Sequence, residues 1–146
     1  MNSVEEKDHG WERIKGEVEN ASSVKVGILS DSEDDDEGTD MLLIAAANEF
    51  GTNRIPARPF IRGAFDEHQS DLRKMAERLW SQVMEGRMGF NRALGLLGEY
   101  HEGQVKRYMT ALDAPANAPS TVLQKGSSNP LIDEGRLRNS VRWELE

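Results

Sequence analysis

The stretch that decides the fold is residues 62–84, RGAFDEHQSDLRKMAERLWSQVM. Its apolar residues recur at separations built from threes and fours: Phe65, Leu72, Met75, Leu79 and Val83. This period places them on one face of a helix, so the sequence predicts a long helix that ends near Gly86 and Gly89. A second long helix is expected over residues 90–112, where the same period is kept by Leu94, Leu97, Val105, Tyr108 and Leu112.

Three glycines lie inside this second helix, at positions 95, 98 and 103. Each costs about 1 kcal/mol relative to alanine in a helix interior. Either they let another segment approach the helix closely, or the helix bends there, and both interpretations stay open at this point.

Two short stretches far apart in the chain have a two-residue apolar period. The apolar side chains are Val24, Val26 and Ile28 in the first stretch, and Val141, Trp143 and Leu145 in the second. Such alternation is typical of a strand with one buried face. We therefore expect an α+β fold, in which a small antiparallel sheet packs against two long helices, with extended loops between the elements.

Shorter helical pieces complete this prediction. Asp40 is placed to cap a helix over residues 40–48, and Gly51 is placed to end it. Residues 130–140 are expected to form a turn followed by a short helical piece. A linker is expected at residues 113–120 and one helical turn at 120–124.

The N-terminal part is highly charged. Within residues 5–19, Trp11, Ile14 and Val18 form a narrow apolar stripe, so this segment is either a short helix or a frayed end. We divide the chain into a charged N-terminal segment, residues 1–21, and a single domain, residues 22–146.

The net charge of −8 is unevenly distributed over the 146 residues. Residues 1–40 carry 13 acidic and 4 basic side chains, whereas residues 41–146 carry 13 acidic and 14 basic side chains. A nearly neutral body argues against general nucleic-acid binding, which requires clustered Lys and Arg. There is no cysteine, and no apolar run long enough for a membrane span or a signal peptide, so we expect a soluble protein made in the cytoplasm.

The sequence holds no recognisable motif for catalysis or metal binding. The acidic run at residues 31–40 does not fit a calcium-binding loop, because Leu42 or Ile44 stands where the bidentate glutamate is needed. His101-Glu102 begins like a zinc-protease motif, but Val105 replaces the second histidine. Neither a nucleophile elbow nor a phosphate-binding loop occurs. We therefore expect no enzyme activity, no cofactor and no metal.

Two separated stretches carry a recognisable pattern. The first spans residues 46–62, with EFGT at 49–52 and PARPF at 56–60, and the second spans residues 129–140, with PLID at 130–133 and GRLRNS at 135–140. Together and in this order they resemble the tail-completion or neck (head–tail connector) proteins of long-tailed bacteriophages. Glu134 departs from the threonine usual before that glycine. The resemblance covers about residues 22–146, and the acidic run at 31–40 is not part of the family pattern.

The resemblance implies a structural virion protein rather than an enzyme. Its members form rings at the head-proximal end of the tail or at the neck, complete the tail and support head–tail joining. The expected partners are copies of the chain itself in a ring of six or twelve, other neck and tail proteins, and DNA that passes through the lumen without specific binding. The expected location is the virion, and the host cytoplasm during assembly.

Two sets of residues are candidates for that role. The segment Arg58-Pro59-Phe60 is stiff and offers an aromatic anchor, although Phe60 alternatively fills the chain's own core. The arginines of the two stretches are solvated, pair with carboxylates of a neighbouring subunit, or contact DNA phosphates. The candidate interface residues are Phe50, Arg58, Pro59, Phe60, Arg62, Arg136 and Arg138.

The second set is the acidic run, as a loop in solvent or in a ring's lumen: Asp31, Glu33, Asp34, Asp35, Asp36 and Glu37. In a lumen, these carboxylates would repel DNA and let it slide. Replacing residues 34–36 with asparagine should then slow genome ejection, and unchanged ejection kinetics would refute this hypothesis.

Other functions stay open as alternatives. The chain is alternatively a phage assembly factor absent from the finished particle, or an acidic regulatory protein that binds a basic partner. The acidic run favours the regulatory protein, whereas the neutral body argues against it.

Overall fold

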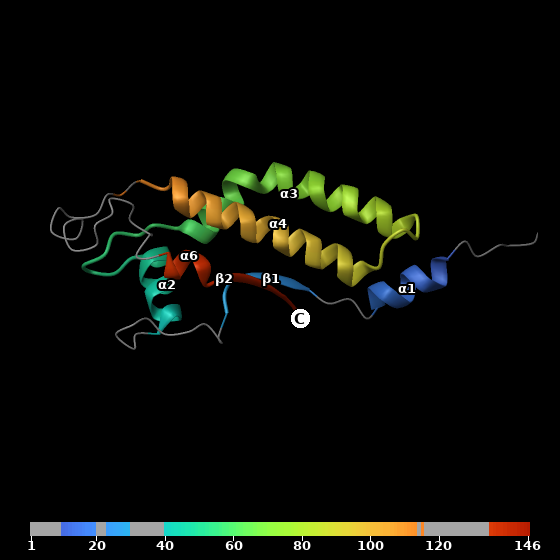
Figure 1. Cartoon of the computed structure of the whole chain (residues 1–146), viewed down its shortest axis with the longest axis horizontal. Helices are drawn as coiled ribbons and strands as arrows, with labels where there is room; N and C mark the ends of the chain where they lie inside the picture. The colour runs from blue at the N-terminus through green and yellow to red at the C-terminus, as the bar shows by residue number, and fades with distance from the viewer. Residues whose placement is uncertain (1–9, 20–22, 30–39, 114, 116–134) are drawn as a thin grey trace, which may run out of the picture.

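The computed structural model describes residues 10–19, 23–29, 40–113, 115 and 135–146 (Figure 1). It confirms the α+β class, with a two-stranded antiparallel sheet and two long helices that pack together. In chain order the elements are α1 (Trp11–Glu19), β1 (Val24–Ile28), α2 (Met41–Phe50), α3 (Phe60–Met84), α4 (Phe90–Ala111), α6 (Arg136–Asn139) and β2 (Val141–Leu145).

The sheet joins two stretches that lie far apart in the sequence, as the alternation predicted. β1 pairs antiparallel with β2, so that Val24 lies opposite Leu145 and Ile28 lies opposite Val141. The ladder continues to Ser23 and Glu146, which exchange backbone hydrogen bonds of 3.0 and 2.9 Å. The side chains of Val26, Ile28 and Val141 belong to the main core.

The two long helices form a hairpin above this sheet (Figure 1). α4 lies against both strands, and α3 packs along α4. α3 begins at Phe60, two residues before the predicted start, and ends before Gly86, whose φ of 72° is favourable only for glycine. α4 covers the predicted residues except the last, because Leu112 is its C-cap.

Close approach explains two of the three glycines in α4. A Cβ atom on Gly98 would lie 2.7 Å from Val24 Cγ2, and one on Gly95 would lie 3.0 Å from the Trp143 ring. These glycines therefore let the sheet approach α4. Gly103 has no such neighbour, since the nearest atom to its Cβ would be Arg107 Nη1 at 3.5 Å.

Both ends of α2 follow the prediction. Asp40 Oδ1 accepts a hydrogen bond of 2.8 Å from the Leu42 amide. Gly51 ends the helix with a φ of 76°, and its amide donates to the carbonyl of Ala47 at 3.0 Å. α6 is the short helical piece expected in residues 130–140, and it follows a left-handed glycine, Gly135, whereas residues 130–134 of that prediction lie outside the described residues. The helical turn expected at 120–124 and most of the linker expected at 113–120 lie outside the described residues.

The N-terminal stripe does form a helix, but only Ile14 of its three apolar residues is buried. α1 contacts the turn of the helical hairpin through two polar contacts. Glu17 Oε2 accepts a hydrogen bond of 2.7 Å from the first amide of α4, that of Phe90, which lowers the pKa of Glu17. Arg13 Nη2 donates to the carbonyl of Val83 at 3.3 Å, near the end of α3. The charges of α1 thus match the polarity of both helix ends.

Candidate interaction surface

The first motif stretch is organised by a buried carboxylate, Glu49. Pro59, the N-cap residue of α3, offers no side-chain cap. Glu49 takes that role from the end of α2, because its Oε2 accepts from the Ile61 amide at 2.9 Å and its Oε1 accepts from the Arg62 amide at 3.2 Å. Glu49 is only 5 % exposed, and its two bonds satisfy partly buried amides in the first turn of α3.

The loop between α2 and α3 begins with a tight turn closed by Thr52. Its amide donates to the Ile55 carbonyl at 2.8 Å, and its Oγ1 accepts from the Arg54 and Ile55 amides. A Cβ on Gly51 would lie 2.8 Å from the nitrogen of Ala57, so the loop folds back closely on this glycine. This turn therefore explains the glycine and the threonine of the EFGT motif, Gly51 and Thr52.

An apolar stripe is exposed on the outer face of α2. Phe50 is 69 % exposed, and Leu43, seven residues earlier on the same helix face, is exposed to a similar extent. The guanidinium of Arg62 lies over the Phe50 ring, 5.2 Å from its centroid, and its Nε donates to Glu49 Oε1 at 2.9 Å. This arrangement fixes an aromatic ring and a positive charge side by side on the surface.

Other residues of the first stretch are buried. Phe60 is 0 % exposed and belongs to the main core. It therefore fills the chain's own core and is not an exposed interface anchor. Arg58 is also buried, and its Nε donates to the carbonyl of Pro115 at 2.9 Å. Burial lowers the pKa of Arg58. Neither side chain presents an exposed anchor, whereas Phe50 and Arg62 are accessible.

The described part of the second motif stretch, residues 135–140, lies beside the first. α6 contacts α2, and Leu137 of α6 is buried in the same core cluster as Phe60 and Met41. Arg136 and Arg138 are partly buried, and the Nε of Arg138 has no hydrogen-bond partner within the described part of the chain. The structure therefore brings residues 135–140, the described part of the second stretch, beside the first stretch at one end of the molecule (Figure 1), and residues 129–134 lie outside the described residues.

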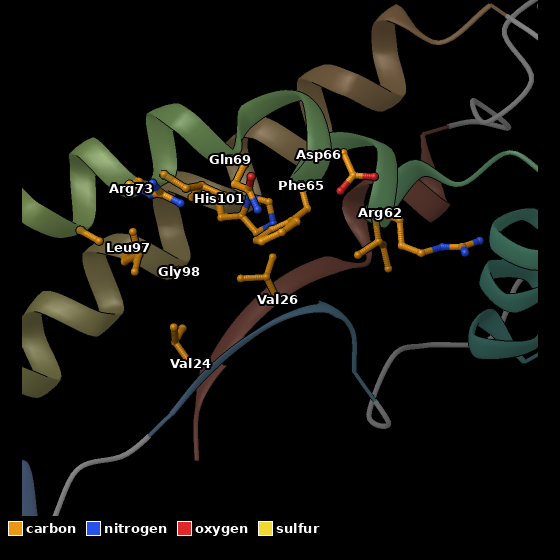
Figure 2. Close-up of a pocket in the computed structure, with 13 residues that line it drawn as sticks. Val24, Val26, Arg62, Phe65, Asp66, Gln69, Arg73, Leu97, Gly98 and His101 are labelled. Carbon is orange, nitrogen blue, oxygen red and sulfur yellow. The ribbon is translucent and has the colours of Figure 1, made fainter.

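A groove of about 690 Å³ lies between β1, α3 and α4 (Figure 2). Figure 2 shows Val26 pointing from β1 toward Phe65 and His101, and Arg62 extending away from the groove toward α2. The ring of His101 contacts Phe65 edge-on at 5.9 Å, and its Nδ1 lies 3.3 Å from Gln104 Oε1. Burial is the main cause of the lowered pKa of His101, which therefore favours the neutral imidazole.

Within the described ranges, no group of three or more His, Asp or Glu side chains is placed to hold a metal ion. The same residues include no helix that is both long and apolar enough to span a bilayer. The acidic candidates, Asp31, Glu33, Asp34, Asp35, Asp36 and Glu37, lie outside the described residues. No protein-family model, curated protein or solved structure matches this chain.

Sequence reasoning did not identify two features of this surface. Glu49 stands within the first motif, but only the fold shows that it caps a helix that begins eleven residues later. The groove joins side chains of β1, α3 and α4, and the apolar residues at its wall have the same spacing as core residues. The period of Phe65 and Leu72 indicated a helix face, but not that this face stays partly exposed.

Proposed function

We propose that this chain is a structural virion protein of a long-tailed bacteriophage. It forms a ring at the head-proximal end of the tail or at the neck, completes the tail and supports head–tail joining. The observation that carries the proposal is the pair of sequence stretches at 46–62 and 129–140, which resemble those of tail-completion proteins. Their described parts meet in one core cluster, which supports reading them as parts of one unit.

The α2 stripe, formed by Leu43 and Phe50 with Arg62 over the Phe50 ring, is the surface best suited to a subunit contact. An exposed aromatic ring next to an arginine is typical of residues that dominate interface energetics. In a ring, this patch would meet a different patch on the next copy, which is a heterologous contact that closes. Six copies are expected, with twelve as the alternative.

The contact can be tested by measuring the mass of the assembly. Native mass spectrometry and negative-stain microscopy of the purified chain should give closed rings at high concentration, or upon addition of phage tails. Phe50→Ala should reduce ring formation while the circular dichroism stays unchanged. Trp11→Ala, which removes an exposed aromatic at the opposite end of the molecule, is the control. Equal ring yields from both variants would exclude the α2 stripe as the contact.

The role in the particle requires the phage itself. Deleting the gene should leave filled heads and separate tails, and adding the purified chain should restore whole particles. Detection of the chain in purified virions would distinguish a structural part from a transient assembly factor. Normal infectious particles without the gene would refute the proposal and favour the acidic regulatory protein.

A further inference from the structure

Within the part of the chain that the structure describes, the outer edge of β1 has main-chain groups without hydrogen-bond partners in a regular array. Ser23 and Glu146 exchange both of their backbone hydrogen bonds. Bonded and non-bonded pairs alternate along an antiparallel ladder, so Lys25 and Gly27 bond to β2, whereas the amides and carbonyls of Val24, Val26 and Ile28 point away from it. None of these outward groups has a hydrogen-bond partner among the residues that the structure describes.

The groove described above lies beside this edge. Val24 and Val26 line it from β1, Phe65 and Leu72 line it from α3, and no residue of β2 contributes to it. Phe65 is substantially exposed although it sits on the apolar face of α3. The groove therefore combines an open strand edge with an apolar wall under a helix (Figure 2).

We propose that the β1 edge and this groove form a strand-addition site for an extended segment of a different protein. Its backbone would pair with Val24, Val26 and Ile28, and its apolar side chains would pack against Phe65 and Leu72. A helix could fill the apolar wall, but it would leave the main-chain groups of β1 unpaired, because its own are bonded internally. The proposal does not depend on ring formation.

The geometry of the groove disfavours the sheet of a second copy as the occupant. In each copy, α4 covers one face of the sheet formed by β1 and β2, and α3 lies on that same side (Figure 1). A second sheet added to the β1 edge antiparallel would bring its own α4 into the place of α3. A single extended segment without a helix layer avoids that collision.

Charges on the wall specify the chemistry of the segment further. Asp66 and Arg73 line the groove, and neither forms an ion pair with a described residue. They are seven residues apart on α3, or about 10 Å along the helix axis. Residues on one face of a strand are separated by even numbers of positions, and four positions span about 13 Å. The long Arg73 side chain can make up the difference between this length and the spacing of about 10 Å on α3. The segment would therefore carry a basic and an acidic residue four positions apart, with apolar residues between and beside them.

A synthetic peptide of sequence TVTKTVTETVT, capped at both ends, has this pattern and serves as the probe. Amide hydrogen exchange of the full-length chain, followed by NMR, gives a residue-specific test. In the free protein, the amides of Lys25 and Gly27 should exchange slowly and those of Val24, Val26 and Ile28 rapidly. Bound peptide should slow the three rapid amides selectively.

Variants of both partners separate strand pairing from simple apolar contact. Replacing the central valine of the peptide with proline should weaken binding about tenfold, because proline breaks main-chain pairing. Leu72→Gln in the wall should weaken binding by a similar factor, whereas Ser70→Gln on the same helix, outside the groove, should not. Both variants leave β1 unaltered, so their folding can be confirmed by the slow amides of Lys25 and Gly27.

Three results would overturn the proposal. The first is slow exchange of the Val24, Val26 and Ile28 amides in the isolated monomer, because the edge would already be covered. The second is self-association that protects the same three amides, because the occupant would then be a second copy. The third is no binding of the peptide at millimolar concentration, or binding that leaves these amides rapid.

Discussion

Glu49 and Arg62 are joined by three hydrogen bonds that connect the end of α2 to the start of α3. Glu49 Oε1 accepts from both the amide and the Nε of Arg62, at 3.2 and 2.9 Å. The Nη2 of Arg62 in turn donates to the backbone carbonyl of Glu49 at 3.1 Å. This unit fixes the two helices relative to each other and holds the Arg62 guanidinium over Phe50. The two motif residues therefore connect the core to the surface proposed for assembly.

Loss of the Glu49 carboxylate should destabilise the fold. Glu49→Ala leaves the partly buried amides of Ile61 and Arg62 without their acceptor, and the expected cost is about 1–3 kcal/mol in the free energy of unfolding. Glu77→Ala, an exposed position on α3, should change it by less than about 0.5 kcal/mol. Urea denaturation measures both. Equal stabilities of the two variants would contradict the capping role.

Alanine at the α4 glycines should act in opposite directions. Gly98→Ala places a Cβ 2.7 Å from Val24 and 3.1 Å from Trp143, so strain of about 1–3 kcal/mol is expected. Gly103→Ala meets no close neighbour and should stabilise the helix by up to about 1 kcal/mol. Thermal unfolding of the two variants tests this. A loss of stability in both would show that helix bending, rather than close approach, requires these glycines.

The two phenylalanines of the first motif stretch should behave differently. Phe60→Ala removes a fully buried ring and should cost about 3–5 kcal/mol in the free energy of unfolding. Phe50→Ala removes an exposed ring and its contact with Arg62, which is worth about 0.5–1 kcal/mol at such a site. Chemical denaturation of the monomeric chain compares them. A large loss in Phe50→Ala would indicate that this ring serves the fold rather than assembly.

His101 should make stability depend on pH in the mildly acidic range. Its pKa in the folded chain is lowered below the ordinary 6.5, mainly by burial, so the unfolded chain binds more protons in this range. The stability that depends on neutral His101 is fully present above pH 6.5, and it is lost as the pH falls through the lower pKa of the folded chain. His101→Gln should therefore give a shallower fall in stability from pH 7 downward than the wild type. His68→Gln is the control, and it should keep most of the wild-type slope.

Periodicity in the sequence determined both long helices and both strands of this fold. The three-and-four spacing of apolar residues defined both long helices, and the two-residue alternation defined both strands, because each backbone geometry repeats at a fixed interval. Asp40 and Gly51 marked the two ends of α2, since capping and positive φ depend on local residues. Pairing of the two strands followed from their matching apolar faces.

Only the tertiary structure decided what the motif residues and glycines do. The role of Glu49 depends on amides that follow a proline-containing loop, and the roles of Gly95 and Gly98 depend on strands that lie far away in the chain. Phe50 and Phe60 have the same side chain ten positions apart, but one is exposed and the other is buried. Local sequence specifies backbone conformation, whereas burial is set by which distant surfaces pack together, and that distinction separates the core of this protein from its proposed contacts.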